Sequence, residues 1–209
     1  MKNSSIFTLL SSLFCACLIV SNIVAGKLYA APFGITLTTG VWLFPIVYII
    51  GDVIPEVYGL KAARQVIWTG FLCNLVAVGI FLLTIGLPYP VYWQNQGAFE
   101  VVLGFTPRLL LASFIGYLVG TNINAVILVT MKKFTNGNLL WLRTISSTIF
   151  GEFADSALFL SIAFIGILPL NIILSMIIAQ SLFKIIYEVA FTPITYFVVY
   201  YVKEKELWG

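Results

Sequence analysis

Apolar residues run along this chain in six long stretches, and short polar or turn-rich pieces separate them. A helix needs roughly 20 largely apolar residues to cross the hydrocarbon core of a bilayer, and each stretch meets this requirement. The predicted membrane helices are 6–26, 35–58, 65–87, 107–131, 142–168 and 171–202. The pattern therefore predicts an all-α polytopic membrane protein that forms a single transmembrane domain over residues 1–209.

Composition agrees with this prediction. The chain is 61% hydrophobic and 9% charged, whereas soluble domains carry about a quarter charged residues. The net charge of +3 is small and scattered, which argues against nucleic-acid binding. The chain has no His, and its three Cys lie inside apolar stretches. We therefore expect no metal site and no cofactor.

Basic residues predict the orientation of the helices, because they are enriched in cytoplasmic loops. With a cytoplasmic N-terminus, only Lys27 and Arg108 fall outside. The basic residues that fall inside are Lys2, Lys61, Arg64, Lys132, Lys133, Arg143, Lys203 and Lys205. Both termini are therefore predicted to be cytoplasmic. The protein itself is expected in the inner (plasma) membrane. The outer piece 88–106 contains Tyr89, Tyr92 and Trp93 and is expected to be an interfacial loop.

The two halves of the chain resemble each other. Residues 9–28 align with 109–128 without a gap, and eight of these 20 positions are identical. The same offset sets Gly51-Asp52 opposite Gly151-Glu152. We interpret residues 1–100 and 101–209 as two repeats of three helices each. Since three is odd, the repeats would be inverted, as in many secondary transporters.

Ionisable side chains lie within the predicted helices, where each costs at least about 2.5 kcal/mol unless it is paired or hydrated. The spacing of these residues places them in pairs or rows on single helix faces. They are Asp52 with Glu56, Glu152 with Asp155, and Lys184 with Glu188 in a row with Gln180. Asn22 and Asn122 lie at similar depths. The pattern predicts a convergent polar cavity. Two purely structural alternatives remain open. Lys184 could form an ion pair with Glu188, and Glu56 could pair with Lys61 or Arg64.

The run 51–59, preceded by Phe44-Pro45, resembles the signature of the queuosine precursor transporter family, also called the vitamin uptake transporter family. Residues 143–151, continuing to Asp155-Ser156, resemble a second part of that signature. Further matches follow in order at Ser21-Asn22, Pro107-Arg108, Phe183-Lys184 and Thr192-Pro193. The resemblance covers nearly the whole chain. It implies a six-helix protein that imports a 7-deazaguanine precursor of queuosine (preQ0, preQ1 or queuine) for tRNA modification.

A purine-like substrate gives the polar residues a chemical role. A guanine-like edge offers two adjacent donors, which one carboxylate accepts together, and its acceptors suit Asn, Gln or Lys. We expect Asp52 and Asp155 to be the main contacts. The rest of the candidate site is Asn22, Asn122, Gln180 and Lys184, with Glu152, Glu188 and Glu56 adding charge and Trp42 stacking on the ring.

Other classes of function remain alternatives. The chain could be the vitamin-binding membrane subunit of an ATP-driven uptake system, or a proton or cation channel. An intramembrane enzyme is not expected, because Ile49-Ile50-Gly51-Asp52 lacks the first Gly of an aspartyl protease motif and no Gly-x-Ser-x-Gly is present. The expected partners are the lipid bilayer and a small purine-like substrate, without nucleic acid, and a homodimer is left open.

Overall fold

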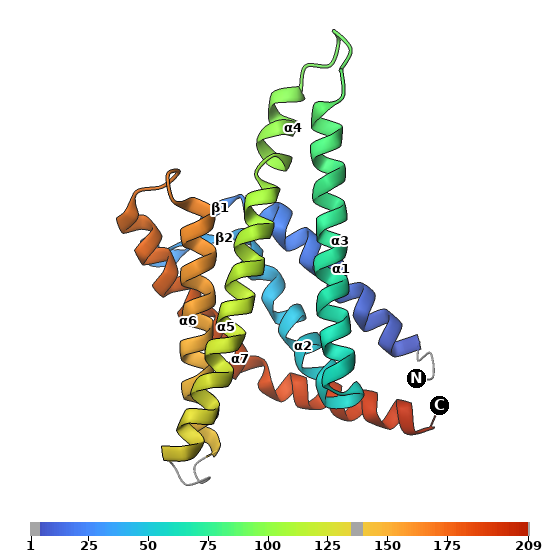
Figure 1. The fold of residues 1–209 in the computed structure, drawn as a ribbon, viewed down its shortest axis with the longest axis vertical. Coiled ribbons are helices and arrows are strands. Elements are labelled where there is room, and N and C mark those ends of the chain that lie inside the picture. The colour runs from blue at the N-terminus through green and yellow to red at the C-terminus, as the bar shows by residue number, and fades with distance from the viewer. Residues whose placement is uncertain (1–4, 135–139, 209) are drawn as a thin grey trace. The chain divides into compact units, whose positions relative to one another are not determined.

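The computed structural model describes residues 5–134 and 140–208 (Figure 1). Lys2, on which the predicted orientation draws, lies outside these ranges. The elements in chain order are α1 (Ser5–Val24), β1 (Leu28–Ala30), the 3-10 turn η1 (Pro32–Gly34), β2 (Thr36–Thr38), the 3-10 turn η2 (Thr39–Leu43), α2 (Phe44–Tyr58), α3 (Leu60–Gly86), α4 (Gln96–Leu103), α5 (Thr106–Phe134), α6 (Leu140–Phe164) and α7 (Leu170–Trp208). In this described part, six helical segments are long and apolar enough to cross a membrane, which confirms a mostly helical, multi-pass membrane protein.

The prediction of a purely helical chain is wrong between α1 and α2. β1 and β2 pair antiparallel, with Leu28 opposite Thr38 and Ala30 opposite Thr36. The strand β2 holds β-branched Thr residues, which favour extended backbone, and the turn between the strands contains Gly34 at a φ of 73°. The second membrane helix therefore starts at Phe44, and not at residue 35 as predicted. Pro45 stands in its first turn, where a missing N–H costs nothing.

Two further boundaries differ from the prediction. The helix α3 begins at Leu60, because Gly59 at a φ of 86° ends α2 and lets the next helix start at once. The piece 88–106, which was predicted to be a loop, contains the helix α4. Gln96 ties α4 to the end of α3 by donating to Ile85 O at 3.2 Å, and it also bonds Glu100 at 2.7 Å.

The chain forms two compact units. Unit 1 takes its described residues from Met1–Gly26, Thr39–Thr106 and Tyr187–Gly209, and unit 2 takes them from Lys27–Thr38 and Pro107–Ile186. Unit 1 therefore contains α1 to α4 and the second half of α7, from Tyr187 onward. Unit 2 contains the β-hairpin, α5, α6 and the first half of α7, up to Ile186.

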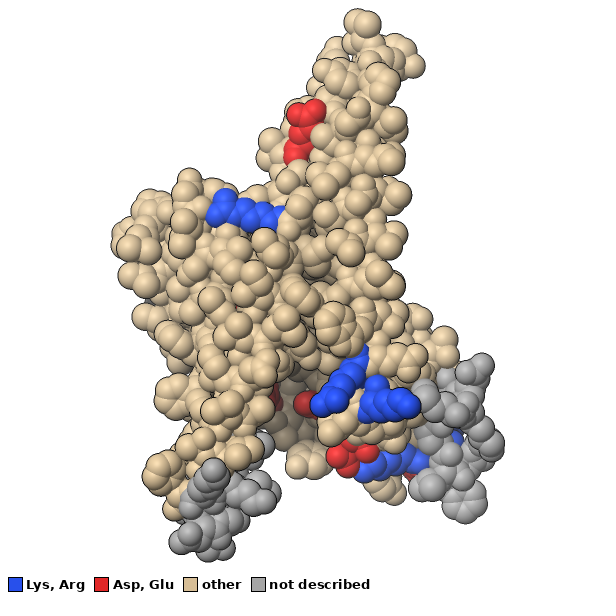
Figure 2. Space-filling view, viewed as in Figure 1, with Lys and Arg blue, Asp and Glu red and all other residues tan. Residues whose placement is uncertain are grey.

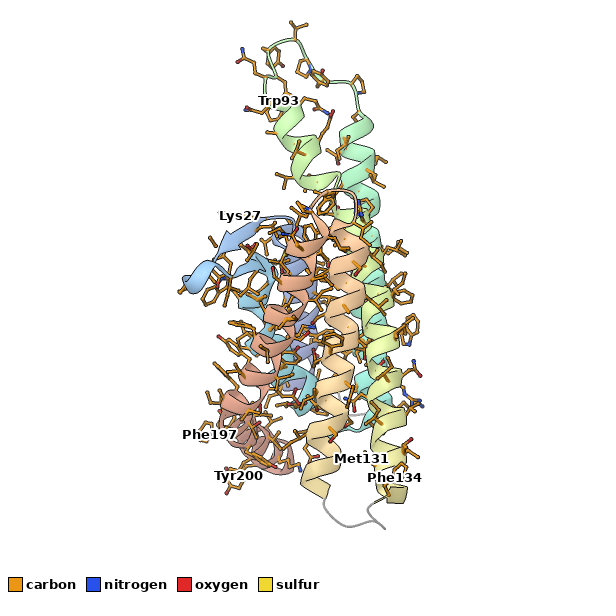
Figure 3. The ribbon with its side chains drawn as sticks, turned by 90° about the vertical axis from the view of Figure 1, so that its left-hand side faces the viewer. Lys27, Trp93, Met131, Phe134, Phe197 and Tyr200 are labelled. Carbon is orange, nitrogen blue, oxygen red and sulfur yellow. The ribbon has the colours of Figure 1, made fainter. Side chains whose placement is uncertain are left out.

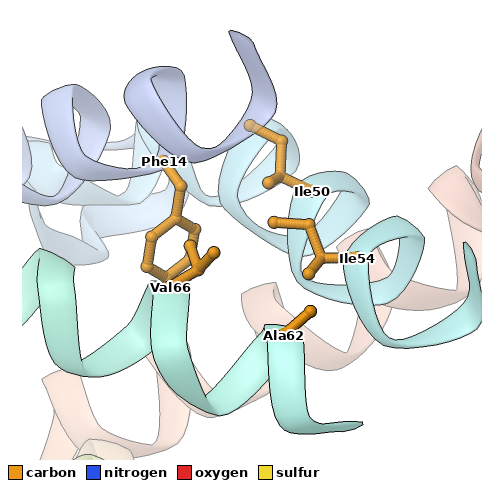
Figure 4. Packing of buried hydrophobic residues seen from close by; sticks show 5 residues of the cluster. All are labelled: Phe14, Ile50, Ile54, Ala62 and Val66. Atoms are coloured by element: carbon orange, nitrogen blue, oxygen red, sulfur yellow. The ribbon is translucent and has the colours of Figure 1, made fainter. Parts of the chain in front are cut away.

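Unit 1 packs around a cluster of apolar side chains from its first three helices. The cluster consists of Phe14 of α1, Ile50 and Ile54 of α2, and Ala62 and Val66 of α3 (Figure 4). Small residues let these helices approach each other, as is common between membrane helices. A Cβ added at Gly70 would lie 3.3 Å from Phe14 Cε1, so α1 and α3 touch closely there.

Large apolar side chains cover the outside of the helices. Trp68 of α3 is 58% exposed, and Leu72, Leu75 and Val76 of the same helix are also exposed. In Figure 2 most of the visible surface is uncharged. Such surfaces are a liability in water but are suited to lipid. Figure 3 shows the two ends of each unit. In unit 2, Lys27 lies at one end, and Met131 and Phe134 lie at the other. In unit 1, Trp93 lies at one end, and Phe197 and Tyr200 lie at the other.

Candidate functional site

A cluster of three charged side chains lies between the helices of unit 2. Lys184 of α7 donates a hydrogen bond to Oδ2 of Asp155, and its Nζ lies 3.0 Å from Oε2 of Glu152. Lys184 is only 5% exposed, and the two carboxylates are half-buried. Both acids come from α6, where their spacing of three residues puts them on one face. With all three groups ionised, the cluster carries one negative charge in excess.

The same cluster is enclosed on its other side by glycines of α5. A Cβ added at Gly116 would lie 2.8 Å from Oδ1 of Asp155, and one added at Gly120 would lie 2.9 Å from Cβ of Asp155. From the opposite helix, a Cβ added at Gly151 would lie 2.9 Å from Cβ of Asn124. These distances leave no room for side chains. The Gly-x-x-x-Gly spacing of α5 therefore brings its backbone against α6 at the level of Asp155.

A second polar contact lies one turn away from Lys184 on α7. The Thr38 hydroxyl of β2 donates to Oε1 of Gln180 at 3.1 Å, and both side chains are 1% exposed. Gln180 and Lys184 are four residues apart and share a face of α7. The β-hairpin, which belongs to the first half of the sequence, thus supplies a partner to the polar face of the last helix. The sequence analysis did not identify Thr38 as a side-chain partner, because the pairing spans 142 residues.

Unit 1 has a buried amide pair. Asn22 of α1 donates from Nδ2 to Oδ1 of Asn74 on α3 at 3.2 Å, and the two side chains are 4% and 1% exposed. Among the described residues, Nδ2 of Asn74 has no hydrogen-bond partner. Asn74 was missed in the sequence analysis. Its signal was an amide side chain in the middle of an otherwise apolar helix.

The acids of α2 differ from each other. Asp52 is exposed, and within the described ranges it makes no hydrogen bond or ion pair. Glu56 forms an ion pair with Lys203 at 2.5 Å. The alternative that Glu56 pairs with Lys61 or Arg64 is therefore replaced by a contact with the far end of the chain.

The remaining candidate residues are more scattered. Asn122 is exposed and donates to Leu118 O of its own helix at 2.6 Å. Trp42 is 59% exposed, and Glu188 is half-buried on the part of α7 that belongs to unit 1. Unit 2 thus brings together Asp155, Glu152 and Lys184, with Gln180 one turn away.

Arg108 has a structural role that the sequence did not indicate. It lies at the start of α5 and donates to Ile162 O at 2.6 Å and to Ile165 O at 2.5 Å. Ile162 lies in the last turn of α6 and Ile165 directly follows the helix. The last four carbonyls of a helix have no partner within it. A cation there also interacts favourably with the helix dipole. Arg108 therefore caps α6 and fixes it to α5.

Comparison with known proteins identifies the family. Residues 38–198 match the family described as “Putative vitamin uptake transporter”. The chain belongs to this vitamin uptake transporter family. Over 166 residues it is 29% identical to a protein of Bacillus subtilis (strain 168) named “Probable queuosine precursor transporter”, and the match covers 78% of this chain and 72% of that protein.

A second relative of this vitamin uptake transporter comes from Escherichia coli (strain K12) and is named “Queuosine precursor transporter”. The two are 28% identical over 153 residues, which cover 73% of this chain and 66% of the relative. No solved structure matches the chain. Members named in this way are transporters, so the chain is a multi-pass membrane transporter and not an enzyme.

Proposed function

We propose that the protein imports a 7-deazaguanine precursor of queuosine through the inner (plasma) membrane. The names of the relatives from Bacillus subtilis and Escherichia coli support this class of substrate. The observation that carries the proposal in the structure is the cluster of Lys184, Glu152 and Asp155 inside membrane-spanning helices. Charges in such a position are expensive and mark substrate or ion pathways.

The cluster suits a guanine-like ring chemically. A carboxylate that accepts from both the ring N–H and the exocyclic amine would bind the donor edge, and Asp155 or Glu152 would supply it. The acceptors of the ring suit Lys184 and the amide of Gln180. Because Oε1 of Gln180 already accepts from Thr38, its two N–H groups would be offered to the substrate.

Asp52 is the second carboxylate that we assign to substrate binding. It lies within a predicted membrane span, and an ionised carboxylate there needs water, a proton or a ligand. Five further residues remain weaker candidates for substrate binding, namely Asn22, Asn122, Glu56, Glu188 and Trp42. Of these, Asn22 and Glu56 already have partners in unit 1, which supports a structural contribution from both.

We further propose that α1–α3 and α5–α7 are inverted repeats and that both termini are cytoplasmic. The support is the sequence offset that matches Asn22 with Asn122 and Gly51-Asp52 with Gly151-Glu152. Each pair falls on corresponding helices, α1 with α5 and α2 with α6. Because each repeat has three helices, the second enters the membrane in the opposite direction, as in many secondary transporters.

The test is uptake in a bacterial strain that lacks its own precursor synthesis, with queuosine in tRNA as the readout. The wild-type chain should restore the modification when a 7-deazaguanine is supplied, while Asp52→Ala and Asp155→Ala should not. Glu100→Gln is the matched control, since Glu100 lies on α4 and its carboxylate accepts a hydrogen bond from Gln96 of the same helix.

The outcomes separate the alternatives. If both variants are expressed normally and restore the modification fully, the assignment of the site is wrong. If the wild-type chain restores it only together with an ATP-driven module, the chain is a binding subunit. Thermal-shift measurements on the purified protein with each 7-deazaguanine and with guanine give an independent readout, because a ligand that binds the folded state raises its stability.

A further inference from the structure

We infer that Gly116 is a positioning residue for the carboxylate of Asp155. The inference rests on the proposed function, since it concerns how one substrate-binding group is held. Asp155 projects from α6 into the space between α5 and α7. Lys184 of α7 engages one of its oxygens, Oδ2, and the other oxygen, Oδ1, faces the backbone of α5 at Gly116.

The distances at Gly116 give it this role. A Cβ at this position would lie 2.8 Å from Oδ1 of Asp155 and 3.0 Å from its backbone oxygen. The first distance is shorter than any real contact of a Cβ atom. The carboxylate therefore occupies the volume that a side chain at position 116 would fill. The carboxylate ends a short side chain that rotates about only two bonds, Cα–Cβ and Cβ–Cγ, so a methyl group at position 116 would turn it away and disturb its bond to Lys184.

Gly120 lies one turn further along α5 but serves a different purpose. A Cβ there would lie 2.9 Å from the backbone oxygen of Gly151 and 2.9 Å from Cβ of Asp155. These atoms cannot rotate away, so the helices themselves would have to separate. Both glycines thus set the approach of α5 to α6, but only Gly116 also borders an oxygen of the Asp155 carboxylate.

The position of the carboxylate matters for binding because a bidentate contact to a ring edge requires both oxygens in a fixed plane. Displacement of a binding group by about 1 Å can cost roughly a hundredfold in rate. Glycine at 116 leaves room for the orientation in which the Asp155 carboxylate contacts Lys184. A merely structural glycine would have no such selective effect on substrate affinity.

The experiment compares Gly116→Ala with Gly120→Ala in proteoliposomes that hold the full chain. The readouts are the initial rate of uptake of a radiolabelled 7-deazaguanine and the apparent melting temperature in detergent. Gly116→Ala should raise KM by about tenfold to a hundredfold, with a smaller change in Vmax. Because its Cβ would also lie 3.0 Å from the backbone oxygen of Asp155, we expect some loss of melting temperature, but less than for Gly120→Ala. Gly120→Ala should mainly lower the melting temperature. Gly79→Ala is the control, because a Cβ at Gly79 of α3 meets no atom within 4 Å.

A double-mutant cycle tests the same inference without transport. If Gly116 acts through the contact of Asp155 with Lys184, the effects of Gly116→Ala and Lys184→Met on melting temperature are not additive, whereas those of Gly120→Ala and Lys184→Met are closer to additive. Additive effects for Gly116 together with an unchanged KM would overturn the inference. If the wild-type chain takes up no 7-deazaguanine, the proposed function fails, and the cycle still decides the role of Gly116.

A second variant covers the case in which Gly116→Ala does not accumulate in the membrane. Asp155→Glu keeps the charge but extends the side chain by one methylene toward the same wall of α5. We expect KM to rise as it does for Gly116→Ala. A wild-type KM for Asp155→Glu would mean that the space beside Gly116 does not define the carboxylate, and the inference would be wrong.

Discussion

Lys184 supplies the positive charge that pairs with Glu152 and Asp155 inside unit 2. It is buried and contacts both Glu152 and Asp155, so its removal would leave two carboxylates close together without a counter-charge. Removal of one partner from a buried ion pair costs about 3–5 kcal/mol, since an uncompensated charge remains. The free-energy cost of removing Lys184 is therefore expected to exceed the net stabilisation that the intact ion pairs provide.

We predict that Lys184→Met lowers stability by about 3–5 kcal/mol and abolishes uptake. Glu152→Gln should cost less, because the contact between Lys184 and Asp155 remains. Thermal unfolding of the purified variants measures the first effect, and uptake of a 7-deazaguanine measures the second. Equal stability of Lys184→Met and the wild type would show that the carboxylates do not need the ammonium group.

The Thr38–Gln180 contact provides a second prediction for single residues. Thr38→Val keeps the shape of the side chain but removes the hydroxyl from Oε1 of the buried Gln180. Leaving a buried polar group without its partner costs about 1–3 kcal/mol, and the released amide should bind substrate more weakly. The matched control is Thr36→Val on the same strand, where Thr36 is half-buried opposite Ala30. If both variants lose the same stability and affinity, the Thr38 bond has no special role.

The sequence could predict which of these residues share a face but not which residues meet. The spacing of Glu152 and Asp155 placed them together on one helix, and the structure has them so. The contact of Asp155 with Lys184 joins residues that are 29 positions apart in the sequence. Glu56 contacts Lys203 across 147 positions. Such contacts depend on helix packing, which periodicity does not contain.

At the scale of elements, the contact of α1 with α3 combines apolar packing with one amide pair. Gly70 accommodates Phe14 and Leu18, and Asn22 meets Asn74 further along the same two helices. Hydrogen bonds between membrane helices contribute about 0.6 kcal/mol on average. The pair is therefore a modest link between the helices, unless Asn22 also touches the substrate.

A comparison of single and double variants distinguishes these roles. Asn22→Leu alone leaves Oδ1 of the buried Asn74 without its donor and should lower stability by about 1–3 kcal/mol. Asn22→Leu with Asn74→Leu removes both groups and should be close to neutral in thermal unfolding. If the double variant is stable and transports normally, the pair is structural. If it is stable but fails to transport, Asn22 belongs to the substrate site.

Long apolar elements were predicted well, and short or irregular ones were not. A stretch of roughly 20 apolar residues has few solutions in a bilayer other than a helix. The hairpin of β1 and β2 escaped prediction because its residues 28–38 are largely apolar or threonine, which suits both a membrane helix and a strand. The helix α4 escaped because its few turns lie in a piece rich in turn residues.

At the scale of the whole molecule, the two compact units do not coincide with the two proposed repeats. The hairpin of the first proposed repeat belongs to unit 2, and the second half of α7, in the second proposed repeat, belongs to unit 1. The exchange is visible in the contacts of Thr38 with Gln180 and of Glu56 with Lys203. Each repeat thus contributes one segment to the other unit, which a gapless alignment of the repeats cannot indicate.

The orientation of the whole chain is the last prediction. Lys27 follows the first membrane helix and Trp93 follows the third, so an odd number of spans separates each from the N-terminus. The surplus of Lys and Arg in the other connections predicts cytoplasmic termini. Lys27→Cys and Trp93→Cys should therefore react with a membrane-impermeant maleimide on intact cells. Lys205→Cys should react only after the cells are permeabilised.

The labelling requires a background in which Cys15, Cys17 and Cys73 are replaced by Ala. These residues lie on α1 and α3, so transport by this background has to be checked first. Parity makes the result decisive, since positions 27 and 93 must behave alike and position 205 must behave oppositely if six helices cross the membrane. Labelling of position 205 on intact cells, with protection at 27 and 93, would reverse the orientation. Equal labelling at all three positions would contradict the number of spans.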